Sequence, residues 1–274
     1  MDPMDRMAPP DGARSQPGSD LSISSIASIW STAICPLPLD CEETDMEEKV
    51  QYERLLPHEF EARITACPVV YVPVGSLEWH GEHMALGNDS LKMHALCCEA
   101  ARVGGGIVYP PIYYNIPGVC SADPARYKHD CTFIGEPDVQ RTLLLATLRS
   151  LERVGFKVAI LTTGHTPREQ IQMMRDVAAA YDGKMRAHGT CDMDFGKEIN
   201  FTSDHAAMWE TSLLWHFEPG LVDLTQLSRD LAVRPFNVYG RDPRVEASPA
   251  LGARAAAVIA RDMAALAARL LDGL

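Results

Sequence analysis

The sequence predicts an α/β fold in which helices cover both faces of a mostly parallel sheet. From Tyr52 onward, short apolar runs alternate with longer segments whose apolar residues have helical spacing. Two of the short runs are followed by polar, motif-like segments, as is usual where the strands of a parallel sheet end. The hydrophobic fraction of 46% suits a globular chain with a well-filled core.

Four short runs are expected to form the strands of this sheet. The first, VVYVPV, is typical of a buried parallel strand because β-branched residues occupy both of its faces. The strands are expected over residues 69–74, 107–109, 158–161 and 184–191. Two of these expected strands lead directly into the polar segments that carry the candidate functional residues.

The segments between and after the strands are expected to be helical. In the second of them, the helical stripe runs through Val139, Leu143, Ala146 and Leu151, and Gly155 provides a stop. The helices are expected over residues 90–103, 138–154, 167–181 and 206–217, with a long alanine-rich helix from Ser248 to the end. Pro167 suits the first turn of the third helix.

The first part of the chain differs in composition from the rest. Residues 1–45 are rich in Pro, Ser, Gly, Asp and Met and have no clear period. We expect a disordered or non-native leader there, with Met46 as a candidate natural start. A single domain is expected over residues 46–274.

Charge and cysteine content limit the partners and the compartment. The formal net charge of −12 argues against nucleic acid and against an anionic membrane surface as partners. No run reaches the roughly 18 apolar residues of a membrane span. The 8 cysteines are scattered and form no CxxC pair, so we expect reduced thiols in a cytoplasmic protein. The expected partner is a small-molecule substrate.

A dense group of possible metal ligands follows the first strand. Glu78, His80 and Asp89 lie there together with Glu82 and His83. Imidazole nitrogens and carboxylate oxygens are ligands that zinc, manganese and iron share, which favours a metal site at the carboxyl edge of the sheet. A solvated polar loop is the alternative, and it is the preferred interpretation for Glu82. His83 is a candidate for orienting a ligand from behind.

Three segments of the chain resemble the creatininase (creatinine amidohydrolase) family. The segment VGSLEWHGEHMALGND, which ends at Asp89, resembles the family pattern PvGsxExHGxHLPLGtD. The strand between Gly155 and His165 is similar to the family's GF…vNGH segment, and HAAMWETSL, beginning at His205, is similar to HAGxxETSl. The segments occur in the family's order, and the resemblance covers roughly residues 50–270.

The resemblance implies a two-metal hydrolase on a three-layer, Rossmann-like sandwich. It also implies a homo-oligomer, such as a hexamer or another multiple of a dimer. Two divalent ions (Zn, Mn or Fe) are implied, and His205 is the candidate for moving a proton to the leaving group. Carried over residue by residue, the ligands are Glu78 and His165 for one ion, His80 and Glu210 for the other, and Asp89 as the bridge.

The departures from the family pattern concern the substrate. Some creatinine-cleaving members use a glutamate two residues after the GH histidine to complete the second metal site, where this chain has Pro167. They also carry a tryptophan shortly before the HAG histidine, and Phe201 and Thr202 occupy that neighbourhood here. We therefore expect a retained metal core with a rebuilt pocket, and not creatinine as substrate. His129 and Asp130 are further candidates for the pocket.

Three functions stay open at the level of sequence. The leading hypothesis is hydrolysis of an amide-like C–N bond in a small cyclic or formyl-substituted compound. The second keeps the metals but opens a ring at a C–C bond of a cyclic polyol diketone of the oxidised inositol type. The third is a non-catalytic metal-binding accessory protein in peptide or cofactor maturation. A dinucleotide-binding turn is set aside because Gly104-Gly105-Gly106 precedes a strand.

Overall fold

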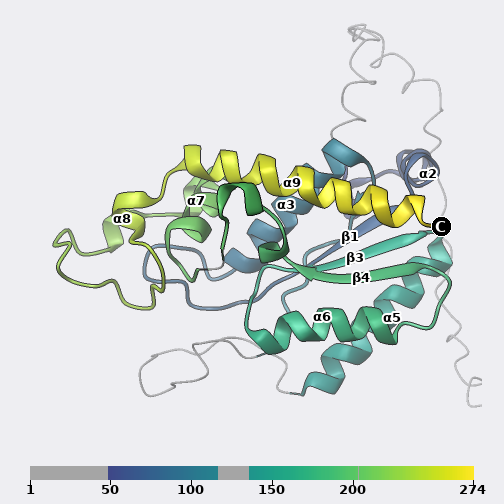
Figure 1. Cartoon of the computed structure of the whole chain (residues 1–274), viewed down its shortest axis with the longest axis horizontal. Coiled ribbons are helices and arrows are strands. Elements are labelled where there is room, and N and C mark those ends of the chain that lie inside the picture. Colours follow the sequence, from purple (N-terminus) through teal and green to yellow (C-terminus); the bar gives the residue numbers. More distant parts are fainter. Residues whose placement is uncertain (1–48, 117–135, 203) are drawn as a thin grey trace, which may run out of the picture. The chain divides into compact units, whose positions relative to one another are not determined.

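The computed structural model describes residues 49–116, 136–202 and 204–274 (Figure 1). The expected leader over residues 1–45 lies outside these ranges, and so do His129 and Asp130. Within the described part, none of the helices is both long enough and apolar enough to cross a membrane.

Within the described residues, the sheet has four parallel strands. They are β1 (Val69–Val74), β2 (Ile107–Val108), β3 (Val158–Thr163) and β4 (Arg186–Cys191). Their order across the sheet is β2-β1-β3-β4, with β1 and β3 in the centre. This confirms the predicted α/β class. All six residues of each central strand are buried, as their β-branched sequences predict.

The register makes three strands end at the same level. The last residue of β1, Val74, is paired with Thr163, and Thr163 is paired with Cys191 at the end of β4. The loops that follow these strands therefore leave from one edge of the sheet. Polar residues in those loops are brought together although they are far apart in sequence.

Helices cover both faces of the sheet, which gives the three predicted layers (Figure 1). Alternate residues of the strands point to opposite faces. Tyr71 and Ile160 face α3 (Asn88–Gly104), α7 (Met208–Phe217) and α9 (Pro249–Asp272). Val72 and Leu161 face α5 (Pro137–Val154) and α6 (Arg168–Ala180). The remaining helical segments are α2 (Pro57–Ala66), α8 (Pro243–Glu246) and short 3-10 helices at Tyr52–Arg54, Asp192–Asp194, Lys197–Ile199, Pro219–Leu221 and Leu224–Gln226.

The buried face of α5 corrects the predicted stripe. Val139 and Leu143 were expected inside, but their side chains are 42% and 43% exposed, and Ala146 is exposed as well. Of the predicted stripe only Leu151 is buried, and the helix buries Gln140, Leu144 and Leu148 beside it. The run Leu143-Leu144-Leu145 fits two stripes about 100° apart, so apolar spacing alone selected the wrong one.

Two further differences concern α7 and the cysteines. The helix begins at Met208 and not at Ala206, because Ala206 has a φ of 51°, which a right-handed helix does not admit. Within the described ranges, the cysteines Cys67, Cys97, Cys98 and Cys191 are free thiols, in agreement with the expected absence of a disulfide set.

Candidate metal centre

The start of α3 is pressed against the ends of β1 and β3, and this places Asp89. A Cβ added at Gly75 would lie 2.2 Å from the backbone nitrogen of Ser90, and one at Gly164 would lie 2.5 Å from the carbonyl oxygen of Asp89. Both positions follow a strand directly, and only glycine permits the helix to approach so closely. Asp89, the second residue of α3, is thus fixed over the sheet edge with 2% exposure.

One group of ligands lies around one oxygen of Asp89. His165 Nδ1 is 3.0 Å from Asp89 Oδ2 and 3.0 Å from Glu78 Oε2. The other ring nitrogen, Nε2, donates to the carbonyl oxygen of Ile116 at 3.0 Å. That hydrogen bond leaves Nδ1 as the ring nitrogen that faces the carboxylates and that would be available to a metal ion. Glu78, Asp89 and His165 therefore converge with one possible ligand atom each.

A second group lies around the other oxygen of Asp89. His80 Nε2 is 3.1 Å from Asp89 Oδ1 and 3.5 Å from Glu210 Oε2. His80 Nδ1 donates to the carbonyl oxygen of Glu78 at 3.0 Å, so Nε2 is the nitrogen that faces the carboxylates. His80, Asp89 and Glu210 form a second set with ligand atoms in mutual reach. The two oxygens of Asp89 thus face two different groups.

The electrostatics of these residues suit bound cations. Burial lowers the pKa of His80, but Asp89 and Glu210 outweigh this and raise it to about 10. Burial likewise lowers the pKa of His165, but the hydrogen bonds that its ring donates to Asp89 and Glu78 outweigh this and raise it to about 10. The carboxylates therefore hold a positive charge at both places when only protons are available. Glu78 Oε1 is buried and, among the described residues, has no hydrogen-bond partner, which fits a ligand atom kept for a metal ion.

Two charged residues at the centre were missed by the sequence analysis. Lys92 is 1% exposed, forms an ion pair with Glu210, and lies 3.2 Å from Asp192 Oδ2. Asp192 is the first residue after β4, and burial raises its pKa to about 6 although Lys92 acts in the opposite direction. Three buried carboxylates, those of Glu210, Asp192 and Asp89, thus face one lysine. Divalent cations would offset the excess negative charge.

A signal for both missed residues is present in the sequence. Asp192 directly follows a predicted strand, as His165 does, so the rule about strand ends applies to it equally. Lys92 lies three residues after Asp89, on the same face of a predicted helix. The lysine type itself gives no reason to expect burial, because lysine is almost never fully buried without a partner.

His205 lies beside the two groups. Its ring centroid is 4.5 Å from that of His80, and its Nε2 donates to the carbonyl oxygen of Trp79 at 3.0 Å. One of its ring nitrogens is within 4.8 Å of possible ligand atoms of Glu78 and His80. Burial, followed by the neighbouring His80, lowers the pKa of His205, so the imidazole is neutral near pH 7. The structure thus brings together all six residues predicted for the site.

The surrounding polar residues differ in part from expectation. His83 was expected behind a ligand, but its Nε2 is hydrogen-bonded to Thr211 Oγ1 at 3.0 Å and the structure gives it no hydrogen bond to a predicted ligand. Buried amides hold the segment beside His165 instead. Gln170 accepts from the backbone nitrogen of Ile116 at 2.9 Å, and Gln140 donates to the carbonyl oxygen of Tyr114 at 2.8 Å.

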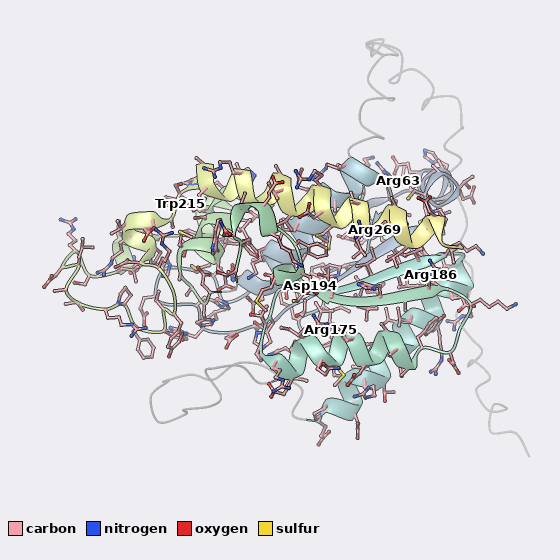
Figure 2. All side chains as sticks on the ribbon, viewed as in Figure 1. Arg63, Arg175, Arg186, Asp194, Trp215 and Arg269 are labelled. Atoms are coloured by element: carbon pink, nitrogen blue, oxygen red, sulfur yellow. The ribbon has the colours of Figure 1, made fainter. Side chains whose placement is uncertain are left out.

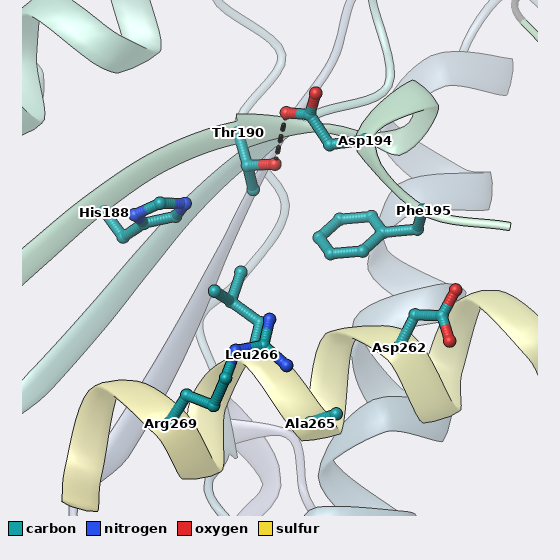
Figure 3. A pocket seen from close by; sticks show the side chains of 8 residues that line it. All are labelled: His188, Thr190, Asp194, Phe195, Asp262, Ala265, Leu266 and Arg269. Carbon is teal, nitrogen blue, oxygen red and sulfur yellow. Dashed lines mark hydrogen bonds between the residues drawn. The ribbon is translucent and has the colours of Figure 1, made fainter. Parts of the chain in front are cut away.

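A separate pocket lies beside β4 and α9 and contains none of the predicted site residues. Arginines of α6, β4 and α9 surround this part of the molecule; they are Arg175, Arg186 and Arg269 (Figure 2). The pocket has a volume of about 320 Å³. Its lining consists of His188, Thr190, Asp194, Phe195, Asp262, Ala265, Leu266 and Arg269 (Figure 3). Asp194 is already bound by Thr190 at 2.7 Å and by Arg175 at 3.2 Å, so its charge is compensated.

The fold and this cluster of buried histidines and carboxylates define a class, that of α/β proteins with a metal site at the carboxyl edge of the sheet. The Creatininase family model, which is described as creatinine amidohydrolase, matches residues 53–268 of this chain. The chain therefore belongs to the creatininase family. This confirms the predicted enzyme class, a metal-dependent hydrolase of the amidohydrolase type.

Known proteins similar to this chain share that name. The creatinine amidohydrolase of Pseudomonas putida is 27% identical over 230 residues, which cover 74% of this chain and 86% of that protein. A crystal structure of creatininase is 24% identical with a TM-score of 0.61, over 80% of this chain and 96% of the other. Similar structures include a manganese form of creatininase and a Zn–Zn form of a creatininase mutant. At this identity the structures establish the shared fold.

Proposed function

We propose that this chain is a dinuclear metal hydrolase that activates water for attack on an amide-like C–N bond of a small cyclic or formyl-substituted compound. The observation that carries the proposal is the division of Asp89. Its Oδ2 faces His165 at 3.0 Å, and its Oδ1 faces His80 at 3.1 Å. A carboxylate whose two oxygens serve two imidazole-containing groups is the geometry expected of a bridge between two cations.

Each ion would have a ligand set of its own. Glu78, His165 and Asp89 Oδ2 would hold the first, and His80, Glu210 and Asp89 Oδ1 would hold the second. Zinc and manganese suit these nitrogen and oxygen donors, and similar creatininase structures are named for both metals. When bound, two such ions lower the pKa of a coordinated water and polarise a carbonyl group.

His205 is proposed to move the proton. The Nε2 hydrogen bond to Trp79 fixes the ring and leaves Nδ1 with a lone pair. Since burial keeps His205 neutral near pH 7, the imidazole can accept a proton from the attacking water and pass it to the leaving nitrogen. Its position against the His80 ring keeps it beside the centre without making it necessary as a ligand.

The substrate is proposed to differ from creatinine. Pro167 stands where some creatinine-cleaving members carry a glutamate, and it precedes the first turn of α6. Phe201, in the neighbourhood of the family's tryptophan, packs edge-on against Trp209 at 5.3 Å and is 6% exposed. Phe201 therefore contributes to the core and not to a cover over a ligand. A C–N bond is favoured over the C–C bond because the family is one of amidohydrolases.

Metal analysis of matched variants tests the dinuclear centre. We expect about two transition-metal ions per purified wild-type chain and the loss of both in Asp89→Asn, because the bridge contributes to both ligand sets. Glu82→Gln is the control, since this exposed glutamate lies in the same loop and should leave metal content unchanged. Fewer than one ion per wild-type chain, without activation by added Mn²⁺ or Zn²⁺, contradicts the proposal.

Product analysis then separates the possible bonds. The metal-loaded enzyme should convert candidate lactams to ring-opened amino acids, or candidate formamides to an amine and formate. Turnover confined to oxidised inositols would replace the C–N proposal with the C–C alternative. Two tightly bound ions without turnover of any of these compounds would favour the accessory-protein function.

A further inference from the structure

Lys92 lies at the base of the centre, on the side of the second ligand group. Its ammonium group forms an ion pair with Glu210 Oε1, whereas Glu210 Oε2 is bound by the backbone nitrogen of Ala206 at 2.8 Å. The ammonium group is also 3.9 Å from Asp89 Oδ1, the oxygen that faces His80. It therefore contacts two of the three residues of the second group. Of the first group (Glu78, Asp89 and His165), Asp89 is the one residue that forms an ion pair with Lys92 among the described residues.

The position of Lys92 is fixed by its surroundings. The residue lies on α3, and its side chain is 2% exposed. A Cβ at Gly164 would lie 3.2 Å from Lys92 Cε, so the end of β3 closes over the stem of the side chain. Asp192 holds the ammonium group at 3.2 Å from behind. A cation held this way cannot move to solvent when a second cation arrives.

We propose that Lys92 is a built-in cation that weakens the second metal position and makes it the less tightly filled of the two. This inference rests on the proposed dinuclear centre. The lysine shares the negative charge of Glu210 and of Asp89 Oδ1 with any ion bound there, and it repels that ion at short range. Asp192 moderates the effect by neutralising part of the lysine charge. Among the described residues, the ion pairs of Lys92 are with Asp89, Asp192 and Glu210, and none is with Glu78 or His165 of the first position.

A purely structural role for Lys92 makes the opposite prediction. If the lysine only holds Glu210 in place, its removal frees that carboxylate and weakens the second ion. If its charge acts as proposed, removal strengthens the second ion even though one hydrogen bond is lost. The sign of the change in metal affinity therefore distinguishes the two roles.

The test is a titration of metal-free protein with Mn²⁺. Binding is measured during the titration by calorimetry and by the electron paramagnetic resonance signal of free Mn²⁺. For Lys92→Met we expect the second dissociation constant to fall by at least about tenfold, with a smaller change in the first. For Asp192→Asn we expect the second constant to rise, because the lysine charge is then less compensated. Lys92→Gln, which is neutral but keeps a hydrogen-bond donor, should behave like Lys92→Met and serves if that variant does not fold.

A matched control and three outcomes complete the experiment. Lys49→Met removes another ion-paired lysine, 2.9 Å from Glu59 and away from the centre, and should change neither constant. A second ion that binds equally or more weakly in both neutral Lys92 variants overturns the proposal while leaving the dinuclear centre intact. One ion in wild type but two in the variants supports it in its strongest form. One ion throughout overturns both proposals.

Discussion

Gly75→Ala should disable the metal centre without touching any ligand. The added Cβ would lie 2.2 Å from Ser90 N and 2.5 Å from the carbonyl carbon of Asp89, whereas ordinary contact begins at 3.4 Å. The start of α3 must therefore retreat by about 1 Å, and both neighbouring atoms belong to the backbone that carries Asp89. Metal–ligand distances tolerate roughly 0.2 Å, so the bridge would leave both ligand groups.

The magnitude follows from the cost of overpacking. Strain of this kind costs about 1–3 kcal/mol, which corresponds to a roughly 5- to 150-fold weaker binding of the ions if the distortion opposes them. The assay is Mn²⁺ binding to folded, metal-free protein, with far-ultraviolet circular dichroism to confirm the fold. Gly87→Ala is the control, because its Cβ would meet only side-chain atoms of Leu91 and Tyr113 at 3.4 Å. Two ions bound by Gly75→Ala at wild-type affinity would refute the reasoning.

Two further predictions concern histidines near the centre. His205→Asn should lower kcat by about 10²- to 10⁴-fold while metal content stays at the wild-type level, as measured by steady-state kinetics beside elemental analysis. An unchanged kcat would remove His205 from the mechanism. Burial, with a contribution from His80, lowers the pKa of His83 from 6.5 to about 4, so below pH 6.5 the unfolded chain binds a proton that the folded chain excludes. Stability should therefore fall as pH falls, by about 2 kcal/mol from this residue between pH 7 and 5. Urea unfolding at several pH values should show a smaller loss in His83→Gln, and an equal loss in both proteins would assign the effect elsewhere.

The sheet and the relative placement of the ligands could be predicted from sequence because both depend on short-range rules. The β-branched run at Val69–Val74 is buried on both faces, and its period leaves no competing assignment. Once the strands are parallel, the residues that follow them must meet at one edge. Glu78 and His165 were placed together on that basis, and their side chains are 3.0 Å apart.

What escaped prediction depends on contacts that no local pattern specifies. Lys92 is buried because Glu210, far along the chain, and Asp192 compensate its charge. The spacing of Lys92 from Asp89 indicates its place near the centre, but the two partners that permit its burial lie in other segments. The orientation of α5 failed for a related reason, since Leu143 and Leu144 are equally apolar and the sheet selects between them. The predicted homo-oligomer and cytoplasmic location stay predictions.

The convergence of ligands from distant segments has a consequence for the chain's cohesion. An ion shared by Asp89 and His165 would cross-link α3 to the end of β3. An ion shared by His80 and Glu210 would cross-link the loop after β1 to α7. Each link closes a long loop of chain, and closing long loops removes more entropy from the unfolded state than closing short ones. Bound metal ions would thus act as removable cross-links between the segments that carry these residues. On loss of the ions, α7 and the start of α3 should lose stability before the central strands do.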